Sequence, residues 1–248
     1  MNAENMILDL VRKSLSETND LVYLPKTAFY NEGWLLRLAL EEFYKWPLKE
    51  LNPKDFGTGW LSEGLLQPPF KKEGSTHVDG IMGDFVKRPK TKGGLMLAEG
   101  ATQLVVFEAK LFSWFSKSIA NAPGYNQVAR TVACITNLFC IRNTHNIQNE
   151  IQLFENRLGL ILLLPEQVKK ERDISITSLV CKDNIKKIIL ERISTSDNLR
   201  NQPQDVFKDI MNAVVNHLKI EVISWETITE ELTWLRPYYD KCLIYNKG

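Results

Sequence analysis

The chain has 248 residues, of which 44% are hydrophobic and 25% charged, and its formal net charge is +1. These are ordinary values for a globular protein that is long enough to bury a full core. The low net charge argues against coating nucleic acid through bulk charge, and no segment approaches the roughly 20 apolar residues that span a bilayer. Residues 1–5 show no signal-peptide pattern, so we expect a soluble, cytoplasmic protein without membrane contact.

The elements expected along the chain alternate between helices and strands. Apolar spacing predicts a helix over residues 4–17 and a second helix over 32–44, which Asn31 caps and Pro47 ends. Residues 47–75 are rich in Pro, Gly and Lys and predict a long loop around a short apolar piece at 60–66.

The central and C-terminal thirds of the chain predict the sheet and its covering helices. Strands are expected at 77–86, 103–111, 158–164 and 220–225, and helices at 123–141, 183–193, 204–218 and briefly from Glu226. The first two strands are joined by a turn region at 89–94. This order predicts an α/β fold with a mixed central β-sheet flanked by helices. We expect a single domain over 1–248, with N-terminal helices and a C-terminal helical and strand extension.

Cysteine and histidine residues are scattered along the chain. They are Cys134, Cys140, Cys181, Cys242, His77, His145 and His217. None of the cysteines shows the C-x-x-C spacing of a zinc site, and no histidine pair lies near them. We therefore expect reduced core cysteines and do not expect a zinc enzyme.

Three charged residues lie on two of the expected strands. Asp79 lies near the start of one strand, and Glu108 and Lys110 lie near the end of the next. Because side chains alternate across a strand, Glu108 and Lys110 should emerge on one face while Ala109 points away. Burying such charges is unfavourable unless they are paired or hold a metal ion. The three residues are therefore the strongest candidates for a functional site.

This arrangement resembles the PD-(D/E)XK nuclease superfamily, which has the restriction-endonuclease-like fold. The resemblance rests on Asp79 and on the triplet Glu108, Ala109 and Lys110, and it covers about the middle third of the chain. Val78 stands where the family's name has proline, a position that varies among members.

The resemblance implies a metal-dependent nuclease that hydrolyses phosphodiester bonds of DNA with Mg²⁺ or Mn²⁺. Asp79 and Glu108 would be metal ligands together with the carbonyl of Ala109, and Lys110 would orient the attacking water and offset transition-state charge. The family also implies a role in restriction or mobile-element defence, in a homodimer or a larger defence complex.

Other polar residues have both a functional and a structural interpretation. Glu32 resembles the acidic residue that many family members carry on the helix before the sheet, yet a Glu in a first helical turn is also favoured by the helix dipole. Gln127 matches a polar residue that contacts phosphate or metal-bound water in some branches. Thr131, however, replaces the usual Tyr four residues later.

Three further residues near the candidate site are assigned mainly structural roles. Asp84 should point away from Asp79 by strand parity and serve a turn or a salt bridge. Trp114 and Phe115 could stack on bases or anchor their loop to the core.

Two other classes of protein remain alternatives to the enzyme. One is a catalytically inactive PD-(D/E)XK-fold subunit that binds nucleic acid or a partner, although the presence of all three central residues favours activity. The other is a structural or sensor protein whose effector domain lies on another chain. Endonuclease and exonuclease activity, and DNA and RNA substrates, are not distinguished by the sequence.

Overall fold

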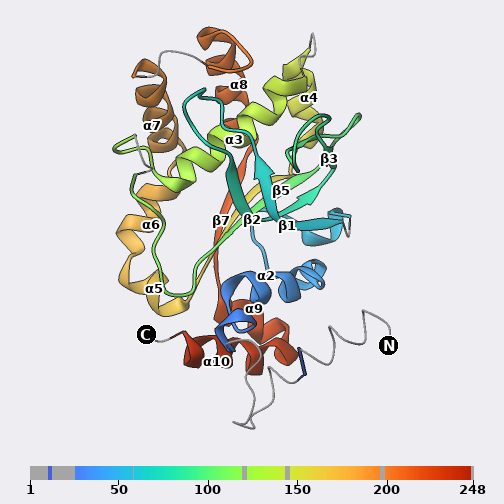
Figure 1. Ribbon diagram of the computed structural model, residues 1–248, viewed down its shortest axis with the longest axis vertical. Coiled ribbons are helices and arrows are strands. Elements are labelled where there is room, and N and C mark those ends of the chain that lie inside the picture. The colour runs from blue at the N-terminus through green and yellow to red at the C-terminus, as the bar shows by residue number, and fades with distance from the viewer. Residues whose placement is uncertain are drawn as a thin grey trace.

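A computed structural model describes residues 11–12, 26–57, 59–118, 122–142, 146–195 and 199–246. Its centre is a five-stranded sheet in the order β1-β2-β5-β6-β7 (Figure 1). The strands are β1 (Trp60–Leu66), β2 (Thr76–Gly83), β5 (Leu104–Ala109), β6 (Leu158–Leu164) and β7 (Lys219–Ser224). The first three pair antiparallel and the last three pair parallel, so the sheet is mixed. A separate hairpin joins β3 (Phe85–Lys87) to β4 (Leu95–Leu97).

Helices cover both faces of the sheet. They are α2 (Glu32–Leu40), α3 (Gln127–Arg142), α4 (Ile147–Phe154), α5 (Glu166–Glu171), α6 (Asp173–Val180), α7 (Lys182–Ser194), α8 (Gln204–His217), α9 (Trp225–Glu231) and α10 (Arg236–Tyr245). One core lies between the sheet and α3, α7 and α8, and a second lies between the sheet and α2, α9 and α10. Figure 1 shows these two groups of helices at opposite ends of the view, with the sheet between them.

The expected mixed sheet flanked by helices is confirmed. The apolar run Leu158–Leu164 forms β6, every residue of which is buried between β5 and β7. A run without alternation suits this position because both faces of the strand are covered. The helices expected at 183–193 and 204–218 are α7 and α8, and the last strand is β7.

Several boundaries differ from the sequence prediction. The loop expected over 47–75 is wrong for Trp60–Leu66, which pairs with β2 as an edge strand. Helices α4, α5 and α6 were not predicted, because they are short or largely polar segments between stronger signals. The helix expected at 123–141 begins at Gln127, where Asn126 caps it by accepting a hydrogen bond from Ala129 N at 2.8 Å. Apart from residues 11–12, the helix expected at 4–17 lies outside the described residues.

The strand expected at 77–86 is interrupted at Gly83. This glycine has φ of +121°, and a Cβ there would lie 2.3 Å from the carbonyl oxygen of Gln103. Only glycine fits such a position without moving the backbone. Asp84 then accepts hydrogen bonds from Thr102 N at 2.9 Å and Gln103 Nε2 at 2.8 Å, so it holds a turn as expected.

The cysteines are reduced, but they are not all in the core. Cys134, Cys140 and Cys242 are buried, whereas Cys181 is exposed at the junction of α6 and α7. Of the helices that the structure describes, none combines the length and the apolar character needed to cross a bilayer.

Candidate active site

The candidate site lies where β2 and β5 separate. Their ladder runs from the pair Gly83 and Leu104 to the pair Gly80 and Phe107, and it stops before Asp79 and Glu108. Beyond this point a side chain replaces the backbone pairing, because Ala109 N donates to Asp79 Oδ2 at 2.7 Å. Since the N–H and the carbonyl of a strand residue point to the same neighbouring strand, the carbonyl of Ala109 also faces β2. The end of the ladder thus places a carboxylate beside the peptide of Ala109.

The alternation along β5 directs Glu108 and Lys110 to one face and Ala109 to the other, as predicted. Leu104 and Val106 belong to the core beneath α3, whereas Phe107 and Ala109 belong to the core beneath α2. The Glu108 side chain bonds to α3, and the Lys110 ammonium lies 5.8 Å from the ring centroid of Phe115, in the same core.

Lys110 is the central cation of the site. Its Nζ lies 3.7 Å from Asp79 Oδ2 and 4.0 Å from Glu32 Oε1, and 11% of its side chain is exposed. Its backbone is held from two sides, because Lys110 N donates to the Leu163 carbonyl at 2.9 Å and Trp225 Nε1 donates to the Lys110 carbonyl at 3.2 Å. The lysine is therefore fixed at the strand end and reaches the solvent only at its tip.

Glu108 is buried beneath α3, with 1% of its surface exposed. Gln127 Nε2 donates to Glu108 Oε2 at 2.6 Å, and Thr131 Oγ1 donates to Glu108 Oε1 at 2.8 Å. Burial and the nearby Asp79 carboxylate raise the pKa of Glu108 to about 8, against the smaller effects of Thr131, Lys110 and Gln127. Without a metal ion, burial and the Asp79 carboxylate thus favour the protonated form of Glu108 near neutral pH.

Glu32 joins the site from the first turn of α2. Asn31 caps this helix by accepting a hydrogen bond from Trp34 N at 3.0 Å, and Glu32 Oε2 accepts one from Leu111 N at 3.0 Å. Burial raises the pKa of Glu32, with Lys110 opposing that shift. Glu32 therefore has two structural effects. It holds the backbone directly after Lys110 through a hydrogen bond, and it places a negative charge at the N-terminus of α2.

The approach of α2 to the sheet depends on Gly80. A Cβ at this position would lie 3.2 Å from side-chain atoms of both Leu36 and Leu40 on α2, and 3.3 Å from Phe107. The missing side chain lets the helix pack closely over β2. This packing brings the N-terminus of α2, and with it Glu32, to the end of the sheet.

Gln127 links the site to the loop before α3. Its Oε1 accepts from Ser116 N at 3.4 Å while its Nε2 reaches Glu108. Phe115 is 1% exposed and anchors this loop in the core, and Trp114 is partly buried with the Arg172 guanidinium 4.8 Å from its ring centroid. Phe112, two residues after Lys110 in the chain, is instead exposed at 47%.

The structure thus brings together all five residues that the sequence singled out, and it adds two. Thr131 occupies the position where the family pattern has Tyr, and the spacing of four from Gln127 already placed it on the same helix face. Trp225 supports the Lys110 backbone from α9, far along the chain, and no sequence pattern pointed to it.

The donor set suits a hard divalent cation with few protein ligands. The described residues contain no group of three or more His, Cys, Asp or Glu side chains arranged to hold a metal ion. Asp79 and Glu108 form a pair of carboxylates beside a backbone carbonyl, and Mg²⁺ is commonly held by one or two carboxylates with water and phosphate oxygens. Repulsion between the two carboxylates, which contributes to the raised pKa of Glu108, is the repulsion that a cation would relieve.

Comparisons with protein-family models, curated proteins and solved structures found no significant match to this chain.

Proposed function

We propose that this protein is a metal-dependent nuclease of the PD-(D/E)XK type, with a restriction-endonuclease-like fold, that hydrolyses phosphodiester bonds of DNA. The observation that carries the proposal is the meeting of Asp79 and Lys110 at the splayed end of β2 and β5, where their side chains are 3.7 Å apart. Glu108 lies two residues before Lys110, on the same strand face. Two carboxylates and one lysine thus lie together where β2 and β5 separate.

Asp79, Glu108 and the carbonyl of Ala109 would hold the ion. A bound Mg²⁺ would lower the pKa of water and stabilise charge on phosphate oxygens. Lys110, which is fixed through its backbone, would position the attacking water and offset negative charge that develops in the transition state. Gln127 and Thr131 orient the Glu108 carboxylate, and Glu32 keeps a second carboxylate near the Lys110 ammonium.

The direct test is cleavage of plasmid DNA, linear DNA and RNA by purified protein. Reactions with Mg²⁺, with Mn²⁺ and with chelator are compared for the wild type and for Asp79→Ala. We expect cleavage of DNA only with a metal ion and only by the wild type. Equal cleavage by Asp79→Ala would assign the activity to a contaminant or to another site.

One observation favours the inactive subunit as a second candidate. Both Glu108 oxygens already accept hydrogen bonds from α3, and the side chain is nearly inaccessible. A carboxyl group that stays protonated in this arrangement would serve packing rather than metal binding. Nucleic-acid binding in chelator without cleavage at any metal concentration would support this second candidate.

A further inference from the structure

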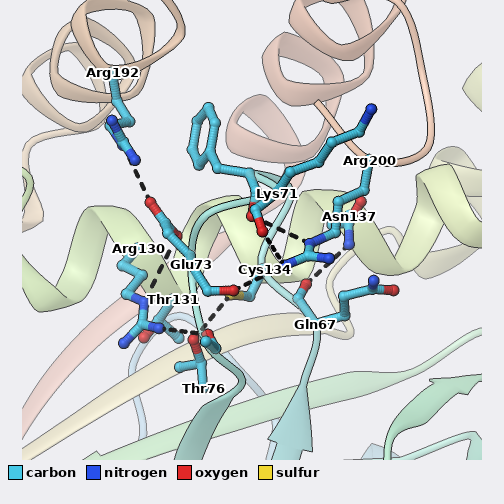
Figure 2. A network of polar contacts seen from close by, with 12 residues as sticks. Gln67, Lys71, Glu73, Thr76, Arg130, Thr131, Cys134, Asn137, Arg192 and Arg200 are labelled. Atoms are coloured by element: carbon cyan, nitrogen blue, oxygen red, sulfur yellow. Dashed lines mark hydrogen bonds and ion pairs between the residues drawn. The ribbon is translucent and has the colours of Figure 1, made fainter. Parts of the chain in front are cut away.

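A second charged cluster lies around Glu73, in the loop between β1 and β2. Arg192 Nε of α7 donates to Glu73 Oε1 at 3.1 Å, and Arg130 Nε of α3 lies 3.8 Å from Glu73 Oε2. Arg200 Nη2 donates to the Glu73 carbonyl at 2.8 Å. Figure 2 shows the three arginines approaching this loop from separate segments. We call Glu73, Arg130, Arg192 and Arg200 the arginine cluster.

The arginine cluster carries more positive than negative charge. Arg200 is engaged by loop carbonyls, since it also donates to Phe70 O at 3.1 Å and Lys71 O at 2.7 Å. Glu73 is then the single carboxylate that pairs with both Arg130 and Arg192 within the described part of the chain. The Arg130 and Arg192 side chains are only 20% and 12% exposed, so this excess of positive charge favours an additional anion nearby.

Arg192 is held in one orientation by its surroundings. Its guanidinium carbon lies 4.9 Å from the ring centroid of Phe70 and 6.0 Å from that of Tyr125, and the two rings meet edge to face. Among the described residues, its hydrogen bonds involve Nε alone, so both terminal amino groups remain to donate. A fixed guanidinium with free donors is a favourable partner for a phosphate group.

A cavity of about 420 Å³ lies beside Arg192, between the end of α7 and the segment that leads into α3. Its lining includes Pro123, Gly124, Tyr125, Ile188 and Arg192. Glu191 also lines it, but this side chain is exposed and lies 4.0 Å from Lys187. Arg192 is therefore the cation among the residues that line the cavity, which also include the hydroxyl residues Ser194 and Thr195.

Tyr125 supplies an independent sign of a ligand. The residue is 2% exposed, and its hydroxyl has no hydrogen-bond partner among the described residues, as is also true of Glu73 Oε2 and Arg130 Nε in the arginine cluster. A buried hydroxyl without a partner is unfavourable by about 1–3 kcal/mol, and such groups are rare in folded proteins. A ligand oxygen would remove this deficit.

We propose that this cavity binds a phosphate group, with Arg192 as its main contact and the Tyr125 hydroxyl as a second donor. The site goes beyond the proposed nuclease activity, because it is defined by binding and needs no cleavage. Its phosphate could belong to a nucleic-acid strand or to a free phosphate compound, since the same donors recognise both. Tyr125 precedes Gln127 by two residues, so a strand bound at the candidate active site would pass close to the cavity.

The first experiment measures binding in chelator, so that cleavage plays no part. Inorganic phosphate and a 5′-phosphorylated single-stranded DNA oligonucleotide are titrated separately into wild-type protein, Arg192→Gln and the control Arg236→Gln. Arg236 is exposed on α10 and pairs with Asp240. We expect Arg192→Gln to weaken binding by roughly tenfold or more and the control to match the wild type.

The two probes separate the sources of the phosphate. Binding of both, with inorganic phosphate displacing the oligonucleotide, would assign the site to any phosphate group. Binding of the oligonucleotide alone, still weakened by Arg192→Gln, would assign it to nucleic acid. Absence of binding for both probes, or equal binding by Arg192→Gln, would overturn the proposal whatever the cleavage assays show.

Tyr125→Phe keeps the test valid if Arg192→Gln fails to fold. Removing an unpartnered buried hydroxyl should leave the melting temperature unchanged or raise it, while the lost donor weakens phosphate binding about threefold or more. This pairing of unchanged stability with weaker binding distinguishes a ligand contact from a structural one. Wild-type affinity in Tyr125→Phe would exclude the hydroxyl from the site.

Discussion

The two charged clusters that α3 helps to form differ in the sign of their excess charge. The carboxylate cluster, formed by Glu32, Asp79, Glu108 and Lys110, has three acids and one cation, whereas the arginine cluster has three cations and one acid. Residues of α3 contribute to both, through Gln127 and Thr131 in the carboxylate cluster and Arg130 in the arginine cluster. In each cluster the charge of one sign therefore exceeds the charge of the other.

The difference suggests complementary ligands for the two clusters. Excess acid is relieved by a cation, or partly by a proton on Glu108, and excess base is relieved by an anion. A phosphodiester substrate with a divalent ion supplies both kinds of charge. The proposed nuclease activity and the proposed phosphate cavity are therefore compatible, although each is tested separately.

Lys110→Ala should produce the largest effect on activity. The ammonium acts on the water and the transition state more than on the bound substrate, so cleavage should fall by at least about 100-fold while DNA affinity in chelator stays close to the wild type. Cleavage rates and fluorescence anisotropy measure the two quantities. Lys208→Ala, an exposed lysine on α8, is the matched control.

A parallel loss of DNA affinity in Lys110→Ala would change the assignment of this residue. It would make Lys110 a phosphate anchor and would weaken the distinction between an acid-rich catalytic cluster and a basic binding cluster.

Asp79→Ala should abolish metal binding at the carboxylate cluster. Calorimetric titration with Mg²⁺ or Mn²⁺ should show heat of binding for the wild type and for Asp205→Ala, an exposed control at the start of α8, and none for Asp79→Ala. The Asp79 carboxylate also accepts from Ala109 N, so the melting temperature must be measured beside it. A folded Asp79→Ala variant that binds the ion as tightly as the wild type would support the inactive subunit.

The sequence predicted the carboxylate cluster better than the arginine cluster for a physical reason. Asp79, Glu108 and Lys110 lie on two neighbouring strands, where period-two alternation fixes which side chains share a face. The arginine cluster joins segments as far apart as Glu73 and Arg192, which are 119 positions apart. No local sequence pattern predicts such a contact, because it forms only when α3 and α7 pack against the β1–β2 loop.

The edge strand β1 shows why the fold was only partly predictable. Its neighbours in sequence are rich in Pro and Gly, and Glu63 has a positive φ of +56°, so local propensity disfavours a regular strand. Pairing with β2 stabilises it nevertheless. The fully apolar β6 was predictable because a central strand of a sheet covered on both faces requires no alternation.

The stability of the metal-free protein should fall as pH rises from about 4.5 to about 8. Glu108 keeps its proton to about pH 8 in the folded state but loses it near pH 4.5 when unfolded, so the folded state binds more protons across this range. Urea unfolding in chelator at several pH values measures the slope. Glu108→Gln should flatten it, and a wild-type curve without slope would contradict a buried, protonated Glu108.

Metal binding should depend on the same proton. Below about pH 8 a proton must leave Glu108 before the carboxylate can hold an ion, so apparent Mg²⁺ affinity should increase by up to roughly tenfold per pH unit between pH 6 and 7. Calorimetry in buffers of different ionisation enthalpy should report about one proton released. A pH-independent affinity would place the ion away from Glu108.

Glu32→Gln and Gln127→Ala should produce the smallest changes, with cleavage reduced about tenfold because groups that support metal ligands typically alter affinity or activity by roughly 10 to 100-fold. The Gln side chain can still accept from Leu111 N, so Glu32→Gln removes charge near Lys110 while it keeps the backbone contact. Cleavage rate and melting temperature are measured together. Wild-type cleavage with a lower melting temperature would make Glu32 a helix-terminus charge alone, and the catalytic set would then consist of Asp79, Glu108 and Lys110.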